Sequence, residues 1–186
     1  MNKRAFLSGQ LVNLRPLEKS DAAVVAKWVN DPLVTRTMFT GQRPQNLEQV
    51  EGALMGQVSA SENVIFMMTD RKSGKPIGLT GLYDIHLTAR KAEFRIIIGE
   101  ERFWGKGYGT EAARLMLSYG FDRLNLNRIW LGVTADNIAG VRVYEKAGFA
   151  REGILRNDLY RNGRYYDSIR MAVLREEYYC GREERR

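Results

Sequence analysis

Cysteine and histidine are almost absent from this chain, which has one of each among its 186 residues. The lone cysteine, Cys180, cannot form a disulfide within the chain, and such sparse use of cysteine fits a reducing, cytoplasmic compartment. One thiol and one imidazole are also too few for the ligand sets of structural zinc sites. The sequence therefore predicts neither a disulfide framework nor a metal centre.

Long apolar runs are missing as well. None approaches the roughly 20 residues that a membrane-spanning helix needs. Lys3 and Arg4 are not followed by a sustained apolar stretch, so no signal peptide is expected. A hydrophobic content of 44% and a charged content of 27% are ordinary for a globular protein. We expect one domain over residues 1–186, with residues 175–186 as a charged, frayed tail.

Acidic residues are outnumbered by basic ones, 22 against 29, which gives a net charge of +7. Most of this excess lies after residue 101. Such a balance favours an anionic ligand or substrate over a polycation. A nucleic-acid-binding protein is the other reading of a basic chain, but lysine-rich runs are lacking and the arginines are spaced singly among acids.

A glycine-rich stretch, with Gly105, Gly107 and Gly109, lies between a predicted strand at residues 94–98 and a predicted helix. Apolar residues recur at helical spacing after it: Ala113, Met116, Leu117, Gly120, Phe121 and Leu124. Thr110 is the expected N-cap. Glycine permits dihedrals that turn successive N–H groups toward one point, and a helix N-terminus adds partial positive charge. The stretch is therefore predicted to bind an anion, although a plain strand-to-helix turn would use the same glycines.

Two familiar nucleotide motifs are not matched. A P-loop needs Ser or Thr directly after its Gly-Lys pair, whereas Gly107 follows Lys106 here. A dinucleotide fingerprint spaces its last two glycines three apart, and here they are two apart.

Helices and strands are predicted on both sides of this stretch. Two helices come first, from Ser20 or Asp21 to about residue 30 and over residues 46–59, with residues 32–45 irregular. Short turns then separate three strands, which indicates an antiparallel meander over residues 63–69, 76–84 and 91–99.

The second half of the chain adds a buried strand at residues 128–135. Asn137 is expected to cap a helix over residues 138–147, and Gly148 to end it. A hairpin turn is predicted at Asn162-Gly163, with a returning strand at residues 165–174.

Two motifs carry a resemblance to a known family. The first is Arg102-Phe103-Trp104-Gly105-Lys106-Gly107, and the second runs from Asn137 to Phe149. In this order they resemble the GNAT superfamily of acyl-CoA-dependent N-acetyltransferases, over nearly the whole chain and most clearly over residues 83–174. The glycine stretch, and Glu152-Gly153 with Arg156, Asn162-Gly163 and Asp167, are similar to the ribosomal-protein N-acetyltransferase branch. Spermidine and nucleotide-sugar acetyltransferases also lie in that branch.

The resemblance implies an α/β (α+β) GNAT fold, with a central mixed, mostly antiparallel, splayed sheet flanked by helices. It implies transfer of an acetyl group from acetyl-CoA, a cosubstrate, to a primary amine by direct attack in a ternary complex. Neither a cysteine or serine nucleophile nor a metal is then required. Homodimers are common among such proteins, so a homodimer is expected by analogy.

It also assigns the coenzyme contacts. Backbone N–H groups of the glycine stretch would bind the pyrophosphate, and the residues involved are Arg102, Gly105, Lys106, Gly107, Tyr108, Gly109 and Thr110. Free backbone groups near Ile96, Ile97 and Ile98 would pair with the pantetheine arm as a strand does. Asn137 would hold the arm from the other side, in addition to capping its helix.

Tyr144 occupies the position from which the family protonates the departing thiolate. Thiols have a pKa of about 8.5 and phenols a pKa of about 10, so proton transfer from the phenol to the thiolate is close to balanced. The alternative for Tyr144 is a ring that packs against the sheet.

Glu93 occupies the family's common position for the base. Strand alternation puts Glu93, Arg95 and Ile97 on one face, so an ion pair between the first two is the alternative role. Asp158, Asp84 and His86 are competing bases, and the amine could also lose its proton to bulk water.

The acceptor amine is open at this point. Spermidine enzymes of the branch carry an acidic segment between their first two helices, whereas residues 34–43 contain Arg36 and Arg43 and no acid. This favours a peptide N-terminus or an anionic small-molecule amine such as an amino sugar nucleotide over a polyamine. A spermidine acetyltransferase and a non-catalytic acyl-CoA-binding module are the alternatives, while a membrane or nucleic-acid partner is not expected.

Overall fold

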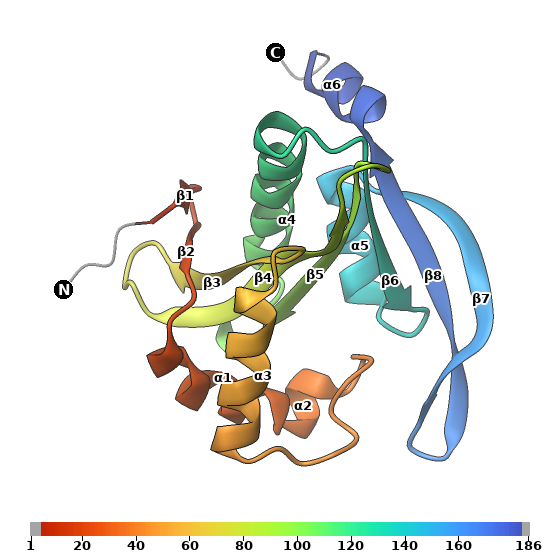
Figure 1. Ribbon diagram of the computed structural model, residues 1–186. Helices are drawn as coiled ribbons and strands as arrows, with labels where there is room; N and C mark the ends of the chain where they lie inside the picture. Colours follow the sequence, from red (N-terminus) through yellow and green to blue (C-terminus); the bar gives the residue numbers. More distant parts are fainter. Residues whose placement is uncertain (1–4, 184–186) are drawn as a thin grey trace.

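The computed structural model describes residues 5–183, in which one eight-stranded sheet is flanked by helices (Figure 1). The strand order is β1-β2-β3-β4-β5-β6-β8-β7. The strands are β1 (Leu7–Ser8), β2 (Val12–Pro16), β3 (Val64–Asp70), β4 (Pro76–His86), β5 (Lys91–Ile98), β6 (Arg128–Thr134), β7 (Ala150–Arg161) and β8 (Arg164–Leu174). The α-helices are α1 (Ala22–Val29), α2 (Pro32–Thr35), α3 (Leu47–Ser59), α4 (Tyr108–Ser118), α5 (Ile138–Ala147) and α6 (Arg175–Glu183).

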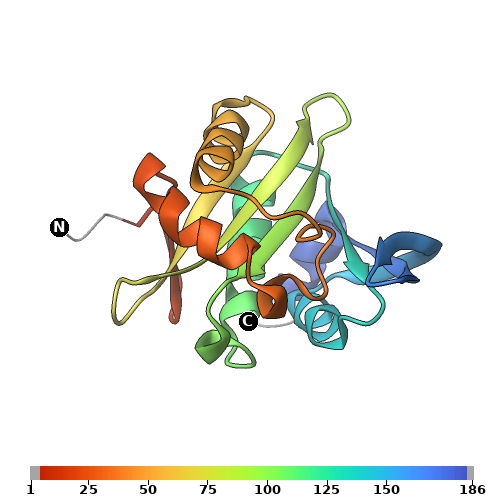
Figure 2. The same cartoon turned by 90° about the horizontal axis from the view of Figure 1, so that it is seen from below.

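The two faces of the sheet are buried by different helices (Figures 1 and 2). Strand β3 shows this directly, because its successive side chains alternate between two hydrophobic cores. Ile65 and Met67 pack with α1 and α3, whereas Phe66 and Met68 pack with the core of α4 and α5. A strand buried on both faces reads as a continuous apolar run, as β3 does.

Strands β5 and β6 are the only parallel neighbours in the described sheet, and they pair over only three residues each. The pairs join residues 91–93 of β5 to residues 128–130 of β6. Beyond Glu93, β5 continues to pair with β4, and β6 continues to pair with β8. The two strands therefore part in the middle of the sheet, and the prediction of a mixed, mostly antiparallel, splayed sheet is confirmed.

Several local predictions are confirmed. The meander is β3, β4 and β5. Helix α5 begins after Asn137, whose Oδ1 accepts a hydrogen bond from the Gly140 N–H at 2.9 Å, and it ends at Gly148 with φ of 116°. Asn162 and Gly163, with φ of 49° and 83°, form the turn between β7 and β8. Positive φ at both central residues suits the twist of a two-residue hairpin.

Three other predictions are corrected. Helix α4 begins at Tyr108 with Gly107 as its N-cap, so Thr110 lies in the first turn and is not the cap. Residues 32–35, expected to be irregular, form α2, because Asp31 accepts a hydrogen bond from the Leu33 N–H and Pro32 is preorganised for a first turn.

The expected frayed tail is instead helix α6 as far as Glu183. The Glu177 carboxylate accepts a hydrogen bond from the Leu174 N–H at 2.8 Å. The Tyr178 ring packs on the Phe121 ring, with the two ring centroids 5.0 Å apart. Residues 184–186 lie outside the described residues.

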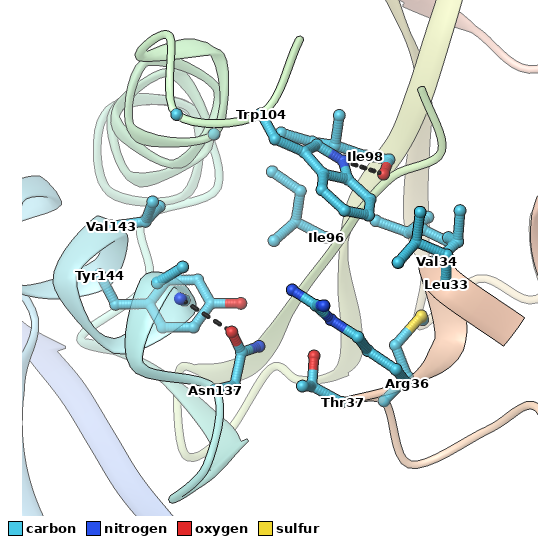
Figure 3. Close-up of a pocket in the computed structure, with 16 residues that line it drawn as sticks. Leu33, Val34, Arg36, Thr37, Ile96, Ile98, Trp104, Asn137, Val143 and Tyr144 are labelled. Atoms are coloured by element: carbon cyan, nitrogen blue, oxygen red, sulfur yellow. Dashed lines mark hydrogen bonds between the residues drawn. The ribbon is translucent and has the colours of Figure 1, made fainter. Parts of the chain in front are cut away.

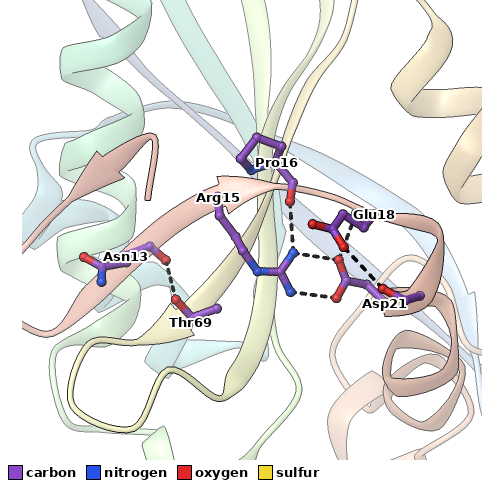
Figure 4. A network of polar contacts seen from close by, with 7 residues as sticks. Asn13, Arg15, Pro16, Glu18, Asp21 and Thr69 are labelled. Carbon is purple, nitrogen blue, oxygen red and sulfur yellow. Dashed lines mark hydrogen bonds and ion pairs between the residues drawn. The ribbon is translucent and has the colours of Figure 1, made fainter. Parts of the chain in front are cut away.

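The entry to α1 is held by a buried ion pair (Figure 4). Arg15 on β2 donates two hydrogen bonds to the Asp21 carboxylate, at 2.7 and 2.8 Å, and a third to the Pro16 carbonyl. Asp21 precedes α1 but makes no side-chain cap, because its carboxylate accepts from Arg15 and from the Glu18 N–H.

The start of α4 is fixed to the sheet edge by two carboxylates. Glu111 accepts hydrogen bonds from the N–H groups of Gln10, Leu11 and Val12, each at 2.8 Å. The Tyr108 hydroxyl donates to Asp70 at 2.8 Å. The first turn of α4, next to Gly105 and Gly107, is thus attached to β2 and to the end of β3.

Candidate active site

A cleft opens where β5 and β6 part, and it holds a cavity of about 210 Å³ (Figure 3). Its walls come from the C-terminal half of β5, the glycine stretch, the N-terminal half of α5 and the segment after α2. The lining residues include Ile96, Ile97, Ile98, Trp104, Gly105, Gly109, Asn137, Val143 and Tyr144. We call it the first cavity.

The glycine stretch presents free backbone donors at one end of the first cavity. Gly105 and Gly107 have φ of 70° and 89°, and Gly107 is the N-cap of α4. The N–H groups of residues 108–110 have no hydrogen-bond acceptor among the described residues, as expected for the first turn of a helix. Together with the positive end of the helix dipole, they form an anion site.

Charged side chains of the stretch lie outside the first cavity. Arg102 is exposed, approaches the Glu100 carboxylate at 3.4 Å and stacks over Phe103. Lys106 is also exposed. The Tyr108 side chain faces Asp70, and burial followed by this hydrogen bond raises its pKa. What the stretch offers an anion inside the cleft is therefore its backbone.

The edge of β5 offers a second set of backbone groups. The Gly99 N–H bonds to the Ile77 carbonyl, so ladder alternation directs the backbone groups of Ile97 to β4 as well. Those of Ile96 and Ile98 face the cleft. The Ile98 carbonyl accepts a hydrogen bond from Trp104 Nε1 at 2.8 Å. Ile96 therefore keeps both backbone groups free in the described residues, whereas Ile98 keeps its N–H.

Tyr144 comes from α5 and points its hydroxyl into the first cavity (Figure 3). Its ring makes edge contacts with Phe94 and Phe149, with centroids 6.2 and 6.0 Å away. Burial raises the pKa of Tyr144 to about 12. The hydroxyl makes no hydrogen bond within the part of the chain that the structure describes, so its proton is available to a ligand.

A second cavity, of about 560 Å³, lies next to the first. It is lined by Glu93, Arg95, Trp130, Asp158 and Arg170, among others. The residues that line both cavities are Thr37, Met38, Ile96, Asn137 and Tyr144. Tyr144 therefore lies on the boundary between two compartments, one with an anion site and one with ionisable side chains.

The candidate bases are separated by the fold. Glu93 lies in the second cavity and is paired with Arg95 at 2.5 Å, so the ion pair predicted from strand alternation is present. Asp158 lies in the same cavity and accepts a hydrogen bond from the Ser168 hydroxyl. Asp84 is exposed and pairs with Arg95 at 3.2 Å, and His86 is exposed at the end of β4. Neither of these two lines a cavity described above.

The segment over both cavities was not foreseen from the sequence. Residues 36–40 cross the cleft, where the Thr37 carbonyl accepts from the Thr134 hydroxyl at 3.0 Å. The Met38 carbonyl accepts from Arg161 at 3.4 Å, and buried Arg161 pairs with Asp136 at 2.7 Å. The contacts of Thr37 and Met38 join residues 97 and 123 positions apart, so no local pattern signals them. Arg36 extends its guanidinium into the first cavity (Figure 3).

Comparisons with known proteins agree with this geometry. A family model described as an acetyltransferase (GNAT) domain matches residues 12–150. The chain is 34% identical over 176 residues to a spermidine N(1)-acetyltransferase of Escherichia coli K12, covering 92% of this chain and 90% of that one. It is 35% identical over 174 residues to a putative ribosomal N-acetyltransferase of Bacillus subtilis, covering 90% and 93%.

A solved structure is similar over the same length. The spermidine N-acetyltransferase from Vibrio cholerae, in complex with CoA and spermine, superposes with a TM-score of 0.83 at 31% identity. The match covers 92% of this chain and 99% of that chain. With a family model over most of its length and relatives above 30% identity, the chain belongs to the GNAT acetyltransferase family and is an acetyl-CoA-dependent N-acetyltransferase.

Proposed function

We propose that acetyl-CoA binds in the first cavity, that the acceptor amine enters through the second, and that Tyr144 serves the reaction where they meet. The observation that carries this proposal is the position of the Tyr144 hydroxyl. It lies on the boundary of both cavities and makes no hydrogen bond within residues 5–183.

The residues of the first cavity fit the parts of acetyl-CoA. The N–H groups of residues 108–110 and the N-terminus of α4 suit a diphosphate. The cleft-facing groups of Ile96 and the N–H of Ile98 suit the amides of a pantetheine arm, which would add to β5 as a strand does. Asn137 lines the opposite wall, and one of its oxygen's lone pairs is used by Gly140.

Acetyl-CoA supplies a thioester whose carbonyl carbon is attacked by the neutral amine. Tyr144 then gives its proton to the sulfur as the carbon–sulfur bond breaks. With its pKa raised to about 12, Tyr144 gives up its proton less readily than an ordinary phenol does. The same apolar surroundings disfavour a thiolate, however, and raise its affinity for the proton. Tyr144 is therefore suited to donate at the moment of bond breaking and to stay protonated before it.

We propose that Glu93 receives the proton that the amine loses, directly or through a water. Its side chain is 17% exposed in the second cavity, within reach of solvent. Asp158 is the competing group in the same cavity. We expect Glu93→Gln to lower kcat at neutral pH more than Asp158→Asn does, and the reverse order would assign the role to Asp158.

The acceptor is proposed to be a peptide N-terminus or a small-molecule amine such as an amino sugar. This is supported by the absence of acids from residues 34–43 and by Arg170, which lies in the second cavity and forms no ion pair within residues 5–183. Spermidine is the second candidate, because relatives more than 30% identical are spermidine acetyltransferases.

A panel of amines, read by release of free CoA thiol, tests this proposal. We expect turnover with a peptide N-terminus or an amino sugar, and slower turnover with spermidine because the Arg170 guanidinium lies in the second cavity and forms no ion pair within residues 5–183. Fastest turnover with spermidine would contradict the proposed acceptor. Inertness of every amine, with acetyl-CoA still bound, would leave only a non-catalytic binding module.

We also propose one cytoplasmic acetyltransferase domain over residues 1–186 that works as a homodimer. A single cysteine supports the compartment, and the exposed apolar side chains of the β7–β8 hairpin, Ile154, Leu155, Tyr160 and Tyr165, support self-association. Within residues 5–183, no helix combines the length and apolar character needed to cross a bilayer. A light-scattering mass equal to the 21.3 kDa chain would contradict the dimer.

A further inference from the structure

Arg170 lines the second cavity but takes no part in the proton transfers proposed for Tyr144 and Glu93. It comes from the middle of β8, and its guanidinium stacks on the Trp130 ring of the neighbouring strand at 4.7 Å. Gly132 is directly opposite Arg170 in the β6–β8 register. A Cβ at residue 132 would lie 3.1 Å from Arg170 Nη1, which is a tight contact. Glycine at this position avoids it and leaves space for the guanidinium.

Arg170 has no carboxylate partner in the described part of the chain, unlike most arginines around the sheet. Arg15, Arg95, Arg128, Arg151 and Arg161 each form an ion pair. In the second cavity, Glu93 forms an ion pair with Arg95, and Asp158 accepts a hydrogen bond from the Ser168 hydroxyl. A partly buried cation without a counter-ion is costly, and an anion that enters the cavity would remove that cost.

We propose that Arg170 binds an oxyanion of the acceptor, so that the preferred acceptor is an amine that also carries a carboxylate or a phosphate. This inference rests on the proposed function, because it places the acceptor in the second cavity. The contact with the Trp130 ring holds the guanidinium in place, and a guanidinium offers a planar fork for two parallel hydrogen bonds to a carboxylate or a phosphate. The cavity also reaches Tyr144, so one acceptor can place its anion at Arg170 and its amine at the thioester.

The test uses matched acceptor pairs and the full-length protein. One pair is an amino acid and its carboxamide, and the other is an amino sugar phosphate and the unphosphorylated amino sugar. Release of free thiol gives kcat/KM for each, and the ratio within a pair measures the preference for the anion. We expect the wild type to prefer the anionic member about tenfold, the size of one charge-assisted hydrogen-bonded contact. The pair with the larger ratio tells carboxylate from phosphate.

Replacement of Arg170 should remove that preference through KM. For Arg170→Gln we expect the ratio to fall to about one, and for Arg170→Lys an intermediate ratio, because lysine keeps the charge without the planar fork. Arg156→Gln is the matched control, since Arg156 is exposed on β7 with no ion pair in the described residues. Thermal melting of each variant shows that it is folded.

Two outcomes overturn the inference alone: equal use of both members by the wild type, or an anion preference that survives in Arg170→Gln. If no amine of either pair is acetylated, the proposed function fails and the inference fails with it. The neutral members tell these cases apart, because their turnover supports the proposed function whatever Arg170 does.

Discussion

Replacing Tyr144 with phenylalanine is expected to lower kcat by about 100-fold or more, the usual range for loss of a general acid. The substitution removes only the hydroxyl, so the ring contacts with Phe94 and Phe149 remain. Affinity for CoA should change little, because the proposed coenzyme contacts are backbone groups of β5 and the glycine stretch. The effect should therefore be confined to the chemical step.

Steady-state thiol release and calorimetric binding of CoA separate these two effects. Tyr160→Phe is the control, since Tyr160 is 56% exposed on the β7–β8 hairpin. A Tyr144→Phe variant that keeps more than a third of the wild-type kcat would contradict the role of acid.

The pH dependence of kcat gives an independent check on the same residue. An acid must hold its proton to donate it, and the pKa of Tyr144 is raised to about 12. Tyr144 therefore stays protonated up to about pH 10, and kcat should show no falling alkaline limb below that pH. A limb that falls near pH 9 and disappears in Tyr144→Phe would assign that limb to Tyr144 and contradict its raised pKa, whereas a limb that persists in Tyr144→Phe belongs to another group.

Gly107→Ala is expected to weaken acetyl-CoA binding by roughly 30-fold. Gly107 has φ of 89°, a conformation that costs a non-glycine residue about 2 kcal/mol. Space is not the limit, because the added Cβ would meet only the Leu11 side chain at 3.4 Å. In the free variant the loop can relax from the dihedral that aims the N–H groups of residues 108–110 at one point, and binding of the coenzyme must then restore it. The 2 kcal/mol is therefore lost from the binding free energy, which corresponds to about 30-fold in Kd.

Calorimetric titration with CoA measures this loss, and Gly153→Ala is the matched control. Gly153 lies on β7 without a positive φ, and a Cβ there meets nothing within 4 Å. Binding of CoA to Gly107→Ala with wild-type affinity would show that the α4 N-terminus does not hold the coenzyme.

Much of this fold could be predicted because its signals are local. Asn137 and Gly148 mark the ends of α5 by capping, and Asn162-Gly163 marks the hairpin by its turn type. The glycine spacing likewise predicted a strand-to-helix junction. The prediction of Thr110 as the N-cap was wrong because Gly107, in the left-handed region, already starts the helix three residues earlier.

Other features depend on partners far along the chain. The sequence places Tyr108 in the glycine stretch that was predicted to bind an anion, yet its hydroxyl donates a hydrogen bond to Asp70, 38 residues away. Ile97 lies on β5, the strand that was predicted to bind the pantetheine arm. Only the register with β4 shows that its backbone groups face away from the cleft. The bond between Arg161 and the Met38 carbonyl spans 123 positions. No pattern in a single sequence reports such contacts.

A crystal structure of the protein with CoA bound is the most direct test of the central claim, that the coenzyme fills the gap between β5 and β6. We predict that the diphosphate lies against the N–H groups of residues 108–110 and that the sulfur lies at hydrogen-bonding distance from the Tyr144 hydroxyl. CoA bound elsewhere, or a sulfur out of reach of that hydroxyl, would contradict it.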